Sequence, residues 1–187
     1  MTTTTITAPV SLTGDYDLDA SHSRLGFAAK HAMVTTVRGQ FHDFTADVHL
    51  DAEHVENTTA RIEIKTASLD TGNPDRDQHV RTSDFLDIET YPTITFVSTG
   101  AEQKNDDEFV LTGDLTIKDV TKPVSIAFEK TGEATDPWGK QRIGFEGKAK
   151  INRKDWGVNW NAALEAGGVL VSEKVTLEFE LSAIKTG

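Results

Sequence analysis

Six histidines are the side chains of this 187-residue sequence best suited to hold a metal or to move a proton. No two of them stand at the His-x-His or His-Glu-x-x-His spacing that places two metal ligands on one side. The chain also has no cysteine, which excludes thiolate catalysis, disulfides and cysteine-bound metals. We therefore predict no metal site. The six are His22, His31, His42, His49, His54 and His79.

His31 differs from the other histidines because it falls in phase with Leu25, Phe27 and Ala29 on one apolar face. A histidine on such a face is most often a core group whose hydrogen bonds are satisfied. The alternative is a polar anchor inside a cavity, and the spacing alone does not separate the two.

Residues 70–81 (DTGNPDRDQHVR) are the densest mixture of polar and charged side chains in the chain. Within this segment Arg76, Asp77, His79 and Arg81 have the chemistry to position the head group of a ligand or to run acid–base catalysis. The alternative is a loop and a helix whose charges pair with one another and with the rim of the fold. Both interpretations stay open at this point.

Several common catalytic and binding motifs are missing. There is no Gly-x-Ser-x-Gly, no Gly-x-Gly-x-x-Gly after a strand and no phosphate-binding Gly-Lys-Ser/Thr. The 19 Lys and Arg stand against 30 Asp and Glu, a net charge of −11 at pH 7 without a basic stripe. Because nucleic-acid backbones are bound by clustered cations, we expect no nucleic-acid partner. We also expect no catalytic residue and no cofactor.

The elements that must position these residues are β-strands, because apolar residues recur at every second position. Such alternation leaves one face dry and one wet, which favours antiparallel strands. The apolar faces are Leu25, Phe27, Ala29, His31 and Met33; Phe44, Ala46, Val48 and Leu50; Ile62 and Ile64; Phe109, Leu111, Leu115 and Ile117; Val124, Ile126 and Phe128; Ile143, Phe145, Ala149 and Ile151; and Val175, Leu177, Phe179 and Leu181.

Two segments break this period. Residues 73–86 are typical of an excursion with a helical turn, and residues 159–168, which end in Gly167 and Gly168, predict a short helix. Eight or nine strands in one sheet must close or split, because long sheet edges promote aggregation. A barrel of about eight strands and a two-sheet sandwich fit the periodicity equally well.

The N-terminal segment and the lack of a long apolar run lead to expectations about domain organisation and cellular location. Residues 1–14 are low in complexity, so we expect a flexible N-terminal arm followed by a single barrel domain over residues 15–187. The arm has no Lys or Arg and no apolar region typical of a signal peptide. No apolar run approaches the roughly 20 residues that span a bilayer. These features predict a cytoplasmic protein.

Eight of the nine phenylalanines lie in the segments expected to be strands, most of them on the apolar faces. One interpretation is an ordinary packed core. The other is a tunnel for an apolar ligand, because small-molecule sites are concave and mostly apolar. A filled core and a lined cavity need the same residue types, so composition does not decide between them.

Six segments, taken together, resemble the YceI family of polyisoprenoid-binding proteins. Each is weak alone, but the six occur in the order and spacing of the family and cover nearly everything after Gly14. They are residues 16–23 (YDLDASHS), 37–44 (VRGQFHDF), 67–79 (ASLDTGNPDRDQH), 84–98 (DFLDIETYPTITFVS), 113–124 (GDLTIKDVTKPV) and 151–157 (INRKDWG).

The resemblance implies an all-β fold: an extended, antiparallel, lipocalin-like β-barrel of about eight strands with one or two short helices. It also implies a lumen that holds an isoprenoid lipid, with His31 as a polar group inside and Arg76, Asp77, His79 and Arg81 near the mouth. Relatives usually carry Phe at the position of Trp156. The lumen lining implied by the resemblance is Phe27, Phe41, Phe44, Phe96, Leu115, Phe128, Phe145 and Trp156.

Three functional hypotheses are compatible with the sequence. The first is non-enzymatic binding, storage or transport of a long-chain isoprenoid lipid, either a polyprenyl compound or an isoprenoid quinone. The second is an enzyme that modifies such a lipid with His31 or His79 as general base. The third is a stress-response or interaction module with a solid core. Transient membrane contact and a homodimer are compatible with the first.

Overall fold

Eleven β-strands make up most of the computed structural model, which describes residues 11–187. One α-helix and four short 3₁₀ helices join them. The strands are β1 (Gly14–Leu18), β2 (Arg24–His31), β3 (Thr35–Phe41), β4 (Phe44–Leu50), β5 (Thr59–Lys65), β6 (Leu69–Asp70), β7 (Thr93–Gln103), β8 (Glu108–Ile117), β9 (Val120–Thr135), β10 (Gln141–Asn152) and β11 (Val171–Lys185); the helix is α1 (Pro74–Arg81).

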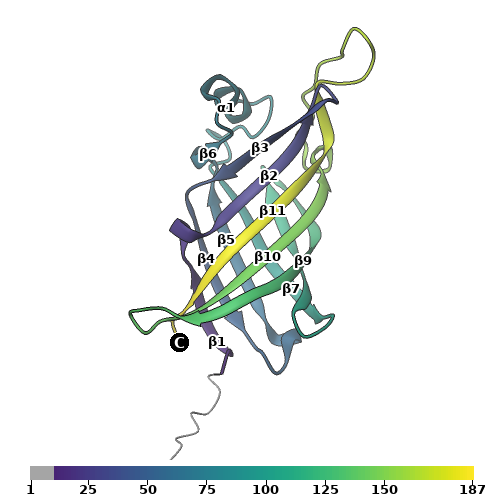
Figure 1. Cartoon of the computed structure of the whole chain (residues 1–187). Coiled ribbons are helices and arrows are strands. Elements are labelled where there is room, and N and C mark those ends of the chain that lie inside the picture. Colours follow the sequence, from purple (N-terminus) through teal and green to yellow (C-terminus); the bar gives the residue numbers. More distant parts are fainter. Residues whose placement is uncertain (1–10) are drawn as a thin grey trace, which may run out of the picture.

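The sheet closes because β1 pairs with β4 on one side and with β11 on the other. Tyr16, for example, lies opposite Val48 of β4 and Lys185 of β11. The closed ring runs β1-β4-β5-β7-β8-β9-β10-β11, and every pairing in it is antiparallel. This confirms the predicted barrel of about eight strands and excludes the sandwich (Figure 1).

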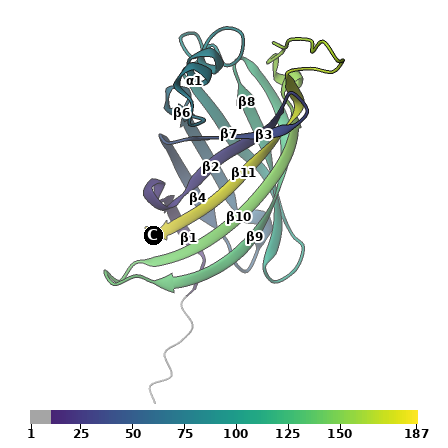
Figure 2. The same cartoon turned by 45° about the horizontal axis from the view of Figure 1, so that its top comes forward.

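The remaining strands extend the barrel at one end. Where β1 stops, β2 takes its place along β11, with Phe27 opposite Leu177. Next to β2 lies β3, and the short β6 follows β3. At this end also lie α1, the β2–β3 turn and the loop of residues 158–170 (Figures 1 and 2). We call this end the mouth.

The predicted helical turn in residues 73–86 is confirmed as α1. The helix begins after Asn73, whose side chain accepts a hydrogen bond from the backbone N–H of Arg76 at 3.0 Å. Pro74 occupies the first turn, where its missing N–H costs no intrahelical bond. Capping and proline together explain why a segment with so little apolar surface forms a helix here.

The second predicted helix, in residues 159–168, is wrong. Gly167 and Gly168 both have φ near +90°, and the chain folds back so that Ala163 bridges Val169. The side chain of Asn161 bonds both the N–H and the carbonyl of Val171. A helix this short forms few hydrogen bonds to offset the free-energy cost of its nucleation. The turn at Gly167 and Gly168 therefore competes with it successfully.

Met33 was expected on the inner face with Leu25 and Phe27, but the strand ends at His31. Residues 32–34 instead form the turn between β2 and β3. The side chain of Met33 is 67% exposed and that of Val34 is 77% exposed. A turn reverses the chain and so breaks the alternation that predicted an interior position.

The core runs along the inside of the ring. A large cluster includes Leu25, Ile62 and Ile126, and a small second cluster gathers around Tyr16 and Ile143 near the opposite end. The expected flexible arm covers residues 1–14, of which residues 1–10 lie outside the described part of the chain. Leu12 packs against the second cluster, and β1 already begins at Gly14.

Within residues 11–187 no helix is long and apolar enough to cross a membrane.

Candidate functional site

An apolar cavity of about 620 Å³ occupies the mouth half of the barrel. Its wall comes from inward-facing positions of the strands, with α1 and the loop of residues 158–170 at the mouth. The apolar lining comprises Leu25, Phe27, Ala29, Val37, Phe41, Ile62, Ile64, Leu69, Val80, Phe85, Leu86, Ile94, Phe96, Leu115, Ile117, Val124, Ile126, Ile151, Val158, Trp160, Leu170, Val171, Val175, Leu177 and Phe179.

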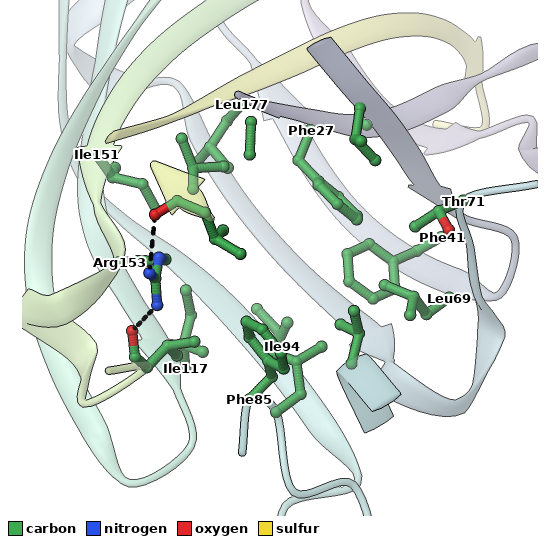
Figure 3. Close-up of a pocket in the computed structure, with 18 of the residues that line it drawn as sticks. Phe27, Phe41, Leu69, Thr71, Phe85, Ile94, Ile117, Ile151, Arg153 and Leu177 are labelled. Atoms are coloured by element: carbon green, nitrogen blue, oxygen red, sulfur yellow. Dashed lines mark hydrogen bonds between the residues drawn. The ribbon is translucent and has the colours of Figure 1, made fainter. Parts of the chain in front are cut away.

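Four of the predicted lumen side chains line this cavity: Phe27, Phe41, Phe96 and Leu115. The rings of Phe27 and Phe41 lie 5.7 Å apart on β2 and β3 (Figure 3). His31 also lines the cavity, at the end of β2, where its side chain is exposed rather than sealed in the core. The anchor interpretation of His31 therefore fits its position better than the core interpretation.

The other three predicted phenylalanines lie outside the cavity lining. Phe44 is buried in the core. Phe128 and Phe145 both pack against Phe109, at ring distances of 5.6 and 5.7 Å, and Phe128 lies 5.7 Å from Phe179. Since Phe179 does line the cavity, this aromatic cluster forms its floor.

Trp156, also expected in the lumen, is 3% exposed and lies outside the cavity lining. Its indole N–H donates to the carbonyl oxygen of Leu115 at 2.9 Å. The ring therefore fastens the 3₁₀ helix Arg153–Trp156 to β8, behind the cavity wall. A buried indole needs such a partner, which accounts for its fixed position.

The four predicted mouth residues divide in the same way. Arg76 and His79 line the cavity, whereas Asp77 and Arg81 do not. Asp77 is buried and accepts hydrogen bonds from the backbone N–H and the hydroxyl of Thr71. Arg81 donates to the carbonyl of Leu69 at 2.7 Å. Asp77 and Arg81 thus hold α1 against the barrel.

His79 lies at the centre of a polar and aromatic contact across the mouth. Its Nε2 lies 2.8 Å from a carboxylate oxygen of Asp84. Its ring meets Trp160 edge-on at 4.6 Å and Phe85 at 5.1 Å. Because Trp160 belongs to the loop of residues 158–170, His79 joins that loop to α1 beside the cavity.

Arg153 is a cavity-lining residue that the sequence marked only as part of the INRKDWG segment and not as a site residue. It is 5% exposed, and its guanidinium donates to the carbonyls of Val158, Ser172 and Val171 at 2.7, 2.9 and 3.3 Å. Burial lowers its pKa from the usual arginine value. The side chain lies between Ile117 and Ile151 in Figure 3. The only available signal was its place in the INRKDWG segment.

These contacts define what the cavity can do. The floor and walls are apolar, and the polar lining side chains come from elements at the mouth: Lys30, His31, Thr71, Asn73, Asp75, Arg76, His79 and Arg153. Such a site fits a molecule with a long apolar part and one polar end. Among residues 11–187, no three His, Asp or Glu side chains converge as a metal site would require.

The sequence of the chain is similar to those of several UPF0312 proteins. It is 39% identical over 150 residues to a UPF0312 protein of Azotobacter vinelandii, covering 79% of this chain and 78% of that one. It is 38% identical over 154 residues to a UPF0312 protein of Pseudomonas aeruginosa, covering 81% and 80%.

Solved structures with the same barrel exist. BcnA of Burkholderia cenocepacia superimposes with a TM-score of 0.78 at 25% identity, covering 88% of this chain and 98% of that one. The YceI protein of Campylobacter jejuni gives 0.73 at 29% identity, covering 84% and 90%. A polyisoprenoid-binding domain from Saccharophagus degradans gives 0.68 at 15% identity, covering 91% and 98%, and so shares the fold.

The model of the YceI-like domain matches residues 16–183, nearly the whole barrel. The resemblance read from the six segments is therefore confirmed, and the chain belongs to the YceI-like domain family.

Proposed function

We propose that this protein binds a long-chain isoprenoid lipid, a polyprenyl compound or an isoprenoid quinone, inside the barrel and stores or carries it unchanged. The observation that supports the proposal is the cavity itself, with its apolar wall and its polar side chains at the mouth. Its volume of about 620 Å³ lies within the range of roughly 300–1,000 Å³ typical of small-molecule sites.

Transfer of the lipid chain from water into the lumen supplies the binding energy. Each buried methylene contributes about 0.8 kcal/mol, so a few isoprene units suffice without polar contacts. Phe27, Phe41 and Phe96 offer flat faces to such a branched chain, and Phe179 marks the depth to which it can reach.

The polar head of the lipid would lie at the mouth. Arg76 is held there by two hydrogen bonds to Thr71, from Nε at 2.8 Å and from Nη2 at 2.7 Å. His31 and His79 line the same end of the cavity. Carbonyl or hydroxyl oxygens of a quinone or a polyprenol are acceptors that these donors can serve. The related Saccharophagus domain is described as polyisoprenoid-binding, which agrees with this class of ligand.

Extraction of the purified protein with organic solvent, followed by mass spectrometry, tests the proposal. We expect a long-chain isoprenoid in near-stoichiometric amount, or uptake of added ubiquinone. Ala29→Phe places a ring into the cavity and should abolish uptake. Ala28→Phe is the matched control, because Ala28 lies outside the lining and pairs with the exposed Arg38. An empty extract together with no uptake would contradict the proposal.

The contact between His79 and Asp84 favours a second candidate, an enzyme with His79 as general base, because a carboxylate orients a catalytic imidazole in this way. Incubation with the extracted lipid distinguishes the two. A change of the ligand mass that is lost in His79→Gln would support catalysis. Unchanged ligand with the wild type, and binding retained in His79→Gln, would support the carrier.

A further inference from the structure

The mouth carries an apolar patch whose exposed tip, Met33 and Val34, lies outside the cavity lining, whereas its inner residues belong to that lining. We define the apolar rim as residues 31–37, at the β2–β3 turn, and residues 158–171. The two segments lie side by side, because the N–H of Ala32 donates to the carbonyl of Leu170 at 2.7 Å and His31 pairs with Val171. Figures 1 and 2 show both at the same end of the barrel.

Met33 and Val34 form the tip of the apolar rim, and most of each side chain is exposed. The turn that presents them is unusual. Ala32 and Met33 have φ of +50° and +61°, and the N–H of Val34 closes the turn on the carbonyl of His31 at 3.0 Å. Turns of this kind usually carry Asn-Gly, because larger residues are strained there. The exposed Met33 is thus held at the mouth in a left-handed backbone conformation that is unfavourable for a residue with a side chain.

The apolar rim is also nearly free of charge. Residues 31–37 contain no Asp, Glu, Lys or Arg, and residues 158–171 contain one, Glu165, although 26% of the whole chain is charged. Lys30, exposed and next to His31, supplies a cation at its border. Soluble surfaces normally alternate charge with apolar groups, so a charge-poor surface beside a cavity mouth indicates contact with an apolar phase.

We propose that the apolar rim docks the mouth of the barrel onto a lipid bilayer, with Met33 and Val34 inserted below the head groups. The inference rests in part on the proposed function, since a long isoprenoid chain partitions into membranes and a carrier must take it up from one or deliver it to one. Docking would align the cavity with the acyl chains, so that the lipid passes between them without crossing water.

A bilayer fits the rim better than a second copy of the chain. A stable protein interface buries roughly 800 Å² on each partner, whereas the rim offers two strongly exposed large side chains and small residues around them. Shallow insertion into a bilayer needs only a few apolar side chains and is reversible. The net charge of −11 opposes strong adhesion to anionic membranes, which suits a carrier that must leave again.

Flotation with phosphatidylcholine vesicles that contain no isoprenoid tests the docking. The wild type should float with the vesicles, and raised salt should not release it, because insertion is apolar. The double variant Met33→Gln, Val34→Thr should lower the partition coefficient about tenfold. Trp138→Gln is the matched control, because Trp138 is 81% exposed in the β9–β10 turn at the opposite end of the barrel. It should leave the partition unchanged.

Two results would overturn the docking: no flotation of the wild type, or equal flotation of the double variant. A concentration-dependent dimer that the double variant loses, without vesicle binding, would also overturn it and assign the rim to a second copy. Extraction of bound lipid separates this inference from the proposed function. Lipid in the extract without flotation contradicts only the docking, and flotation with an empty extract and no uptake of added ubiquinone contradicts only the carrier role.

Discussion

The ring of Phe27 lies across Gly39 on the neighbouring strand, so that a Cβ added to Gly39 would stand 2.3 Å from the Cζ of Phe27. Glycine is the only residue that lets the ring lie this close to the backbone of β3. The pair thereby sets how far Phe27 projects into the cavity.

Gly39→Ala is therefore expected to push the ring of Phe27 into the cavity. The crowding should cost about 1–3 kcal/mol of unfolding free energy and reduce ubiquinone uptake. Urea denaturation and ligand titration measure the two effects. Gly132→Ala is the control, because a Cβ there meets nothing within 4 Å. Unchanged uptake by Gly39→Ala would show that the ring position does not limit the cavity.

Arg153→Met should destabilise the mouth, because the carbonyls of Val158 and Ser172 lose their donor, whereas the carbonyl of Val171 keeps the side-chain amide of Asn161. Buried acceptors without partners cost about 1–3 kcal/mol each when no water reaches them, so we expect a loss of at least about 2 kcal/mol by urea denaturation. Arg153→Lys should restore little, since one ammonium cannot serve three carbonyls in this arrangement. A lysine variant as stable as the wild type would contradict this account.

Trp160→Ala should open the mouth. The Trp160 ring contacts His79 at 4.6 Å and Phe85 at 5.3 Å, and these contacts join the loop of residues 158–170 to the region of α1. Aromatic pairs contribute about 0.5–1.5 kcal/mol each, so release of a fluorescent apolar probe should accelerate about tenfold in stopped-flow measurements. Trp138→Ala, remote from the mouth, should leave the release rate unchanged.

Asp77→Asn should loosen α1 without removing a cavity-lining side chain. One carboxylate oxygen accepts from both the N–H and the hydroxyl of Thr71, and the neutral amide oxygen of Asn is a weaker acceptor than a carboxylate oxygen. We expect faster hydrogen exchange in residues 71–86 and unchanged exchange in β8 and β9. Uniformly faster exchange would instead indicate a loss of global stability.

Asp19 should make stability depend on pH in the acid range. Its side chain is 14% exposed, and hydrogen bonds from Ser21, then Arg142 and His22, hold its pKa well below the usual value. A folded-state pKa below the unfolded one stabilises the protein above the unfolded value of about 4, and this stabilisation is lost as the pH falls further. At neutral pH we expect Asp19→Asn to cost about 1–3 kcal/mol.

Urea denaturation at a series of pH values checks this prediction. The difference between the wild type and Asp19→Asn should be constant above about pH 5 and should shrink below about pH 4. A difference that stays constant into the acid range would show that the carboxylate charge is not the source of the stabilisation.

Alternation along the chain determined the antiparallel strands and their inner faces, because side chains of a strand point to opposite sides in turn. Asn73 and Pro74 determined where α1 begins, since capping acts within a few residues. The six segments predicted a barrel through their resemblance to the YceI family. Closure itself depends on β1 pairing with β11, across almost the whole length of the chain.

Only the tertiary structure decided which inner side chains line a cavity. Phe96 and Phe44 obey the same alternation and are equally buried, yet Phe96 lines the cavity and Phe44 lies outside its lining. Whether rings meet across a barrel depends on its diameter and on neighbours distant in sequence, and no local pattern records either. The burial of Arg153 has the same explanation, because two of the carbonyls that it binds belong to β11. The exposure of Met33 follows instead from the local turn at residues 32–34.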